Sequence, residues 1–314
     1  MSSITFGRTE DGLKASLFEL HNNNGMRVFI TNYGGTITQL WAPDADGDLA
    51  NIVLGFDNLR QYQTESPNFR GLIGRHANRI TNGARAFHKR LWDVRSANSG
   101  SLILELHSYE MEEGDPGNLS VIVGYHLNDH NELCIIYNAQ SDRRTPCDLT
   151  NHTYFNLAGA GRNSILNHRL RLHADQFHSL GEDPGQGAVR SVSGTAMDFR
   201  QFRSIESGIA EVQAGYDHAW LRHPGYGIVA EACEPGSSRT LTMYSTQPSV
   251  RFHSGDFFDG SVHGNGGTYN KHAGFCLAAQ LYPNSLNRPD FPCTILNPGD
   301  LYTQTTVYKF GIAC

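Results

Sequence analysis

The stretch LSVIVGYHL, residues 119–127, carries the pattern that decides the fold class. Its odd-numbered positions hold Leu, Val, Val, Tyr and Leu, whereas its even-numbered positions include Ser, Gly and His. An alternation with a period of two residues places the two sets of side chains on opposite faces of a β-strand. The stretch therefore predicts a strand with one buried face and one wet face, which is typical of antiparallel sheets.

The same alternation recurs elsewhere in the chain. Leucines alternate with arginines in residues 168–173, and Leu and Met alternate with threonines in residues 240–245. Helical patterns are few, the best at residues 199–211 and a weaker one at residues 57–63. Clusters of turn-forming residues separate the predicted strands. These clusters occupy residues 44–48, 96–101, 112–118, 128–131, 233–238, 263–267 and 297–300.

No internal repeat or linker divides the chain. We therefore expect an all-β fold, with residues 1–314 forming a single domain of large packed antiparallel sheets and few short helices. The alternative is a pair of smaller β domains, for which the sequence offers no boundary rich in Pro, Gly or Ser.

Composition excludes some classes of partner. The 314 residues are 39% hydrophobic and 18% charged, and the net charge is −6 without any basic block. Nucleic-acid binding needs clustered Lys and Arg, so we expect no nucleic-acid partner. The N-terminus lacks the basic and apolar regions of a signal peptide, and no apolar run approaches the roughly 18 residues of a membrane span. These features predict a cytoplasmic protein that does not bind a membrane.

The six cysteines, at 134, 147, 233, 276, 293 and 314, include no CxxC pair and mostly occupy apolar contexts. We expect buried free thiols in a reducing compartment. The 15 histidines show no HxH, HExxH or Cys/His ligand spacing, so we also expect no metal.

Four stretches concentrate polar residues. In GLIGRHANRI, residues 71–80, Arg75 and Arg79 lie four positions apart and Asn78 adjoins the second. An arginine in apolar surroundings must be paired or must face a polar cleft. Its guanidinium fork suits two adjacent sugar hydroxyls. The alternative is a structural arginine that fixes a loop.

The other three stretches each offer one candidate. His152, in DLTNHTYFN (148–156), could act as a general acid or base, although a lone histidine is more often a core or loop residue. Asp217, in GYDHAW (215–220), could accept hydrogen bonds from hydroxyls or cap a turn. Gln247, in YSTQPSVRFHSGDFF (244–258), could present its amide to a ligand or simply end a strand. With the neighbouring aromatic residues, these candidates indicate a carbohydrate site.

The motifs NYGGTITQLWAPDADG, NIVLGF, GLIGRHANRI, LTNHTYFNLAG, GYDHAWL, TQPSVRFHSG, HAGFCL and LNRPDFP occur in this order. In these motifs and their order, the chain resembles the aldose 1-epimerases, or galactose mutarotases, over residues 5–312. The resemblance implies a galactose mutarotase-like β-supersandwich with a cleft on one sheet. It also implies the interconversion of the α and β anomers of aldohexoses such as galactose and glucose, without a cofactor. We expect a monomer or a weak dimer.

In this family a base takes the proton of the C1 hydroxyl while an acid protonates the ring oxygen, so that the ring opens and closes again on the other face. By motif, the resemblance assigns the acid role to His152. It assigns contacts with the sugar hydroxyls to Arg79, Asn78, Asp217 and Gln247.

The chain departs from the family pattern in two places. The family's glutamate base follows GFCL, where this chain has Ala278. A hairpin that carries a second active-site histidine is absent between about residues 81 and 86, and His88 does not replace that histidine. Losing a positioned base typically lowers a rate by about 10²–10⁴-fold. We therefore expect impaired catalysis.

Three alternatives stay open: a catalytically inactive hexose-binding or regulatory protein, a decayed or alternatively spliced product without a ligand, and a sugar-phosphate epimerase. The last would need further basic residues beside the cleft, which Arg75 alone hardly supplies.

Overall fold

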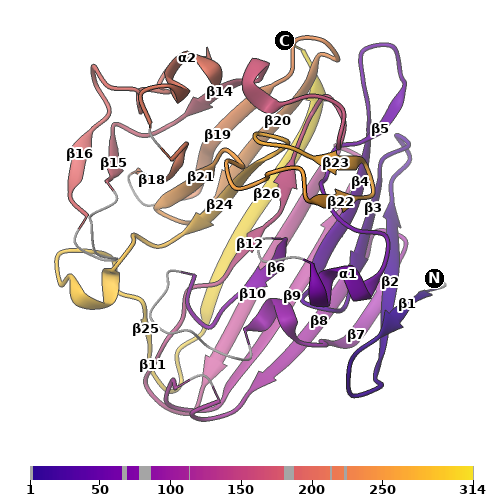
Figure 1. Cartoon of the computed structure of the whole chain (residues 1–314). Helices are drawn as coiled ribbons and strands as arrows, with labels where there is room; N and C mark the ends of the chain where they lie inside the picture. Colours follow the sequence, from indigo (N-terminus) through magenta and orange to yellow (C-terminus); the bar gives the residue numbers. More distant parts are fainter. Residues whose placement is uncertain are drawn as a thin grey trace.

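The computed structural model describes residues 3–65, 69–77, 86–112, 114–179, 187–212, 214–222 and 225–313. Antiparallel β-sheets dominate the secondary structure of this part of the chain, as the sequence predicts (Figure 1). The largest sheet has nine strands in the order β17 (Arg203–Ser204), β14 (Arg169–Leu172), β19 (Gly227–Cys233), β20 (Arg239–Ser245), β26 (Tyr302–Ile312), β10 (Glu132–Ser141), β9 (Leu119–Leu127), β8 (Ser101–Ser108) and β7 (Asp93–Asn98).

Two further large sheets complete the architecture. The six-stranded sheet has the order β13 (Tyr154–Phe155), β24 (Phe275–Gln280), β21 (Ser249–His253), β18 (Asp217–Leu221), β15 (Gln176–His178) and β16 (Val189–Ser191). The five-stranded sheet follows chain order, with β1 (Ile4–Arg8), β2 (Lys14–His21), β3 (Arg27–Thr31), β4 (Thr36–Pro43) and β5 (Leu49–Asn51).

Short elements connect these sheets. Three strand pairs are β6 (Arg70–Ile73) with β12 (Thr150–His152), β11 (Thr145–Pro146) with β25 (Ile295–Leu296), and β22 (Val262–Gly264) with β23 (Gly267–Tyr269). The helices are α1 (Leu59–Thr64), α2 (Glu206–Ile209) and the 3₁₀ turns η1 (Phe87–Lys89), η2 (Ile165–Asn167) and η3 (Ser285–Asn287). None of the helices in the described ranges has the length and apolar character that a membrane span requires.

Strand β9 behaves as its alternation predicts. All five of its odd-numbered side chains are buried, and three of the four even-numbered ones are only partly buried. The predicted helix near residues 57–63 is confirmed as α1, whose first turn begins where the side chain of Asn58 accepts a hydrogen bond from the N–H of Gln61 at 3.1 Å. The longer predicted helix at residues 199–211 is wrong, because Arg203 and Ser204 extend the nine-stranded sheet beside β14 and only residues 206–209 are helical.

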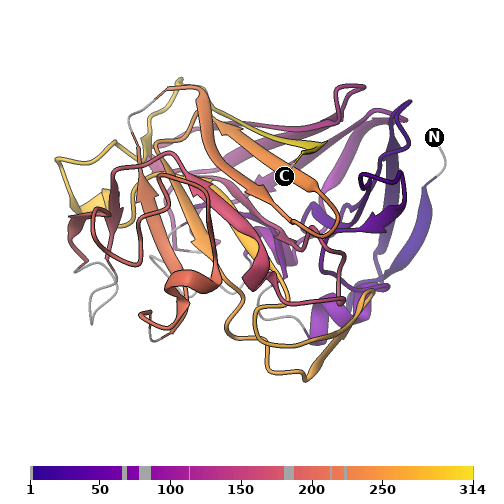
Figure 2. The same cartoon turned by 90° about the horizontal axis from the view of Figure 1, so that it is seen from above.

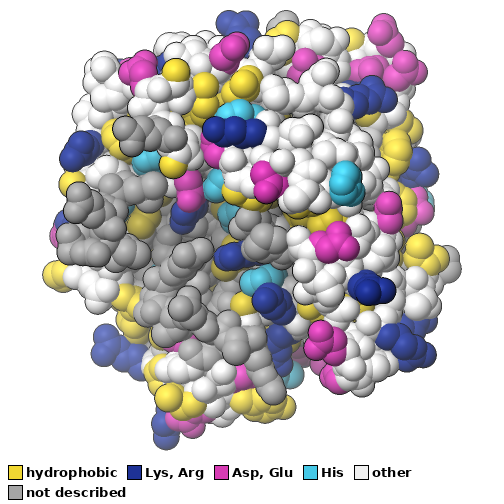
Figure 3. All heavy atoms as spheres, viewed as in Figure 1, with side chains coloured by type: hydrophobic (Ala, Val, Ile, Leu, Met, Phe, Trp, Pro, Cys, Tyr) yellow, Lys and Arg dark blue, Asp and Glu magenta, His cyan; other side chains and the backbone are white. Residues whose placement is uncertain are grey.

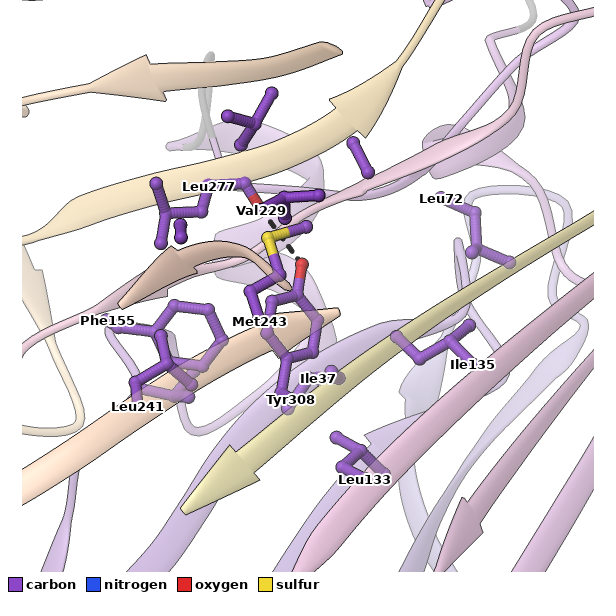
Figure 4. Packing of buried hydrophobic residues seen from close by; sticks show 14 of the residues in the cluster. Ile37, Leu72, Leu133, Ile135, Phe155, Val229, Leu241, Met243, Leu277 and Tyr308 are labelled. Atoms are coloured by element: carbon purple, nitrogen blue, oxygen red, sulfur yellow. Dashed lines mark hydrogen bonds between the residues drawn. The ribbon is translucent and has the colours of Figure 1, made fainter. Parts of the chain in front are cut away.

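One hydrophobic cluster contains side chains of the nine-stranded sheet and of both smaller sheets. Figures 1 and 2 show how the ribbons of these sheets lie around it. Figure 4 shows part of it, with Tyr308 of β26 pointing at Leu277 of β24. The Tyr308 hydroxyl donates to the carbonyl of Leu277 at 2.9 Å. The Tyr125 hydroxyl of β9 donates to the carbonyl of Gly35, beside β4, at 2.6 Å. Hydrogen bonds inside the apolar core therefore add to the hydrophobic packing that holds the sheets together.

The cysteine prediction is only partly correct. Cys147 and Cys276 are buried free thiols, but the free Cys293 is exposed. Cys233, the last residue of β19, is disulfide-bonded. The prediction missed this bond because a spacing motif detects only cysteines that are close in the sequence.

Candidate functional site

Strands β18, β21 and β24 carry the polar face of the six-stranded sheet. Register places Asp217 opposite His253, and places Arg251 between Ala219 on one side and Ala278 on the other. Side chains alternate between the two faces of a strand. Phe252 and Leu277 therefore point into the core. Asp217, Arg251 and His253 point to the opposite face.

An ion pair between Asp217 and Arg251 is the centre of this face. The Nε of Arg251 donates to Oδ1 of Asp217 at 2.6 Å, and Nη2 donates to Oδ2 at 2.8 Å. Burial alone would raise the pKa of Asp217, but the hydrogen bonds and the charge of Arg251 outweigh it and lower that pKa to about 2. The two side chains are 32% and 29% exposed, so a ligand can still reach the pair.

His253 lies beside the ion pair, with its Nε2 4.0 Å from Oδ2 of Asp217. Its Nδ1 accepts a hydrogen bond from the N–H of Gly255 at 2.9 Å, which assigns the ring proton of the neutral form to Nε2. Gly255 makes this turn with φ of +68°, and a Cβ there would lie 2.4 Å from the carbonyl oxygen of Gly274. Burial lowers the pKa of His253, although the charge of Asp217 opposes the shift.

His152 reaches the same face from β12, where it pairs with Arg70 of β6. The ring of Tyr154 lies between the two histidines, 5.4 Å from that of His152 and 5.7 Å from that of His253. Burial first, and then the nearby His253 and Arg251, lower the pKa of His152 to about 3. His152 is therefore neutral at neutral pH, and its Nδ1 is buried without a hydrogen-bond partner in the described ranges.

A hollow of about 530 Å³ opens on this face. Its lining includes Asp217, His253, Asp256, Phe257 and Lys271. His and Lys or Arg side chains lie next to one another near the middle of the face drawn in Figure 3. The hollow combines an aromatic ring with charged and hydrogen-bonding groups, the combination expected of a site for a small polar ligand.

Ala278 is fully buried beneath this face. It packs with Cys276 in a smaller apolar cluster that also contains Phe69 and Phe258. Alanine has no group that accepts a proton, so β24 contributes no base at this position. Within the described ranges, no group of three or more His, Cys, Asp or Glu side chains could hold a metal ion.

The sequence candidates have different locations. Asp217 and His152 come together on the polar face, close enough for the charge of Asp217 to affect the pKa of His152. Gln247 is buried, and its amide donates to the Tyr302 hydroxyl at 3.1 Å. The predicted contacts Asn78 and Arg79 lie outside the described residues, as does most of the stretch between about residues 81 and 86 where we expect the hairpin to be absent.

Arg75 matches the structural alternative. The side chain is buried, and Nη1 donates to the carbonyls of Pro116 and Gly117 at 2.9 and 3.0 Å and to Thr145 Oγ1 at 3.0 Å. These bonds fix neighbouring loops.

Sequence reasoning missed Arg251 and His253. Both lie in the stretch 244–258, in which Gln247 was the predicted ligand contact. The signal that could have found them is a second alternation, in which Arg251 and His253 flank the apolar Phe252.

Relatives of known name and structure resemble the chain over nearly its whole length. The family described as aldose 1-epimerase matches residues 16–87 and 83–309. The galactose mutarotases of Bos taurus and Homo sapiens are both 37% identical, over 324 residues (94% of each chain) and 349 residues (100% of each chain). The aldose 1-epimerase of Escherichia coli is 32% identical over 336 residues, covering 96% of each chain.

Among solved structures, the GalM/aldose epimerase homologue from C. elegans has a TM-score of 0.88 and 25% identity. That match covers 96% of this chain and 100% of the homologue. With the family match over most of its residues, the chain belongs to the aldose 1-epimerase family.

Proposed function

We propose that this chain binds an aldohexose, galactose or glucose, in the hollow beside Asp217. It interconverts the α and β anomers there, much more slowly than a site with a complete acid–base pair. The names of the relatives support the reaction. The observation that carries the proposed impairment is Ala278, which places a methyl group on the strand where the family's base would stand.

The reaction needs two coordinated proton transfers. The O1 proton must leave as the bond from C1 to the ring oxygen breaks, and the ring oxygen must gain a proton. Rotation of the resulting aldehyde and reversal of both transfers give the other anomer. Asp217 is a weak base for the first transfer, because its pKa of about 2 is far below neutral pH and both its oxygens are bonded to Arg251.

His152 stays the proposed acid, but its protonation state limits it. A pKa of about 3 means that the ring offers a neutral N–H at neutral pH and not an imidazolium proton. A carboxylate at position 278 would stabilise the imidazolium, since an opposite charge nearby raises the pKa of a histidine. The absence of that carboxylate therefore weakens both proton transfers.

The absent hairpin is consistent with the form of the family match. The two matched segments, 16–87 and 83–309, meet where the hairpin is expected. The alignment with the Homo sapiens galactose mutarotase spans 349 positions, more than the 314 residues of this chain, so this chain has gaps in it. We propose that the second active-site histidine is lost with this segment.

A second candidate is a catalytically inactive hexose-binding or regulatory protein. The ion pair favours it, because Arg251 occupies the carboxylate that would otherwise be free to accept a proton or a hydroxyl hydrogen bond. We also propose a cytoplasmic location. We further propose a monomeric or weakly dimeric state, and gel filtration would test that oligomeric state.

Polarimetry distinguishes the two candidates. Freshly dissolved α-D-galactose and α-D-glucose would be followed with the wild-type protein, with Ala278→Glu, and with Ala278→Gln as a control of the same shape without a carboxylate. We expect weak acceleration by the wild type and a gain with Ala278→Glu only. Hexose binding without acceleration by any variant would support the inactive binding protein. Acceleration by Ala278→Gln equal to that by Ala278→Glu would show that the carboxylate is not the decisive loss.

A further inference from the structure

We infer that the hollow selects an acidic aldohexose, one that carries a carboxylate or phosphate group, and that Arg251 and Lys271 are the residues that determine this specificity. The inference rests on the proposed function, because it names the substrate class of the same hollow. Its basis is an imbalance at the site, where Arg251 and Lys271 keep unused donors while both oxygens of Asp217 are already bonded.

Arg251 uses only part of its hydrogen-bonding capacity. A guanidinium carries five N–H groups, and the ion pair with Asp217 engages Nε and Nη2. Nη1 has no hydrogen-bond partner in the described part of the chain. The two residues directly across from Arg251, Ala219 and Ala278, are both alanines, so neither has a side-chain group that bonds the guanidinium. Arg251 can therefore hold Asp217 and still donate to a ligand.

Lys271 and His253 add two more donors. Lys271 is exposed, lines the hollow, and makes no hydrogen bond or ion pair with any described residue. His253 presents its Nε2–H because Gly255 occupies Nδ1. Three groups in or beside the hollow thus offer N–H donors, two of them positively charged.

The acids of the lining offer little in return. Both oxygens of Asp217 accept from Arg251. In Asp256, Oδ2 accepts from the hydroxyl of Ser254, whereas Oδ1 has no hydrogen-bond partner among the described residues but is buried away from a ligand. A glutamate at position 278 would add a negative charge and further acceptors, but Ala278 adds neither.

This imbalance favours one class of ligand. Every hydroxyl of a neutral hexose both donates and accepts, so a neutral hexose is best matched by a mixed lining. A carboxylate or phosphate only accepts, and it forms its strongest hydrogen bonds with a guanidinium or an ammonium group. The alternative of a sugar-phosphate epimerase needed basic residues beside the cleft. Lys271 lines the hollow and Arg251 is bonded to Asp217 of the lining, so both are such residues, whereas the buried Arg75 is not.

Titration calorimetry at neutral pH would compare galactose, galacturonate and galactose 6-phosphate, with inorganic phosphate and acetate as anions without a sugar. We expect one of the acidic sugars to bind roughly tenfold or more tightly than galactose. Comparing the two acidic sugars identifies the anionic group. Lys271→Gln and Arg251→Gln should each reduce the preference for the acidic sugar over galactose severalfold. The control Arg95→Gln, on β7 of the nine-stranded sheet, should leave this preference unchanged.

Because Arg251→Gln removes the partner of Asp217, Lys271→Gln at an exposed position provides the test that does not depend on folding. Equal affinity for galactose and both acidic sugars would overturn the inference and leave the proposed function standing. The same preference in both variants, or free phosphate binding as tightly as the sugar acids, would also overturn it. Absence of binding by every sugar would contradict both the inference and the proposed function.

Discussion

Replacing Asp148 by asparagine should remove a loss of stability that the wild-type protein undergoes as the pH rises from about 4 to about 7. Asp148 is completely buried, and both its carboxyl oxygens face the N–H of Leu281 at 3.1 and 3.2 Å. The thiol of Cys147 and the hydroxyl of Tyr302 are close enough for Asp148 to raise their pKa values. Burial raises the pKa of Asp148 from 3.8 to about 7, although the hydrogen bond from Leu281 opposes the shift.

The size of the effect follows from this shift. In the unfolded chain the carboxyl group loses its proton near pH 4, whereas in the folded protein it keeps the proton until about pH 7. The folded state therefore binds more protons in this interval, and the free energy of unfolding falls as the pH rises. A difference of about three pKa units corresponds to roughly 4 kcal/mol. An asparagine keeps the shape and the acceptor for Leu281, but its buried amide N–H groups cost about 1–3 kcal/mol if they lack partners.

Urea unfolding of the wild type and of Asp148→Asn, at several values between about pH 5 and pH 8, measures the difference directly. Other titrating groups are shared by both proteins and largely cancel in it. We expect the variant to be equal or less stable near pH 5 and more stable by about 1–3 kcal/mol near pH 8. Two stability curves that stay parallel over the whole interval would refute the raised pKa and the reasoning built on it.

Three other substitutions test the contacts described above. Tyr308→Phe should cost about 1–2 kcal/mol in urea melts, because it leaves the buried carbonyl of Leu277 without its donor, and an unchanged midpoint would contradict this. Arg75→Met should cost about 3 kcal/mol or more, since it removes hydrogen bonds to several loop carbonyls, and a loss below about 1 kcal/mol would contradict the structural role. Gln247→Ala should lower the melting temperature, because the amide bonds Tyr302, while hexose affinity in calorimetry stays within about twofold. Weaker hexose binding at unchanged stability would instead make Gln247 a sugar contact.

Alternation predicted the strands well, because the burial of one face is a local property of each strand. Strand β9 is the clearest case, since all five of its odd-numbered side chains are buried. The register between strands was not predictable, because it depends on which strands become neighbours. The sequence therefore indicated Asp217 as a polar residue but gave no sign that Arg251, in another strand, would occupy both its oxygens.

The protonation state of His152 was equally out of reach of the sequence. Its motif indicates a histidine suited to proton transfer, but the pKa of that histidine depends on burial and on charges from other strands. In the folded protein those influences lower the pKa to about 3, with His253 and Arg251 contributing after burial. A motif thus identifies a chemical group, while its state at neutral pH is a property of the assembled site.

Arg251 connects the proposed base position to the proposed choice of ligand. It lies directly across from Ala278, so a glutamate restored at that position would compete with Asp217 for the same guanidinium. Hydrogen bonds from an arginine lower the pKa of a carboxylate by about 1–3 units, which makes it a weaker base. If Arg251 binds the new carboxylate, the rate gained by Ala278→Glu should therefore be smaller than the full contribution of a positioned base. An anionic ligand bound to Arg251 would weaken the hydrogen bonds between Arg251 and a carboxylate at position 278. Arg251, which is proposed to select an acidic sugar, would therefore also control how strongly a carboxylate at position 278 acts as a base.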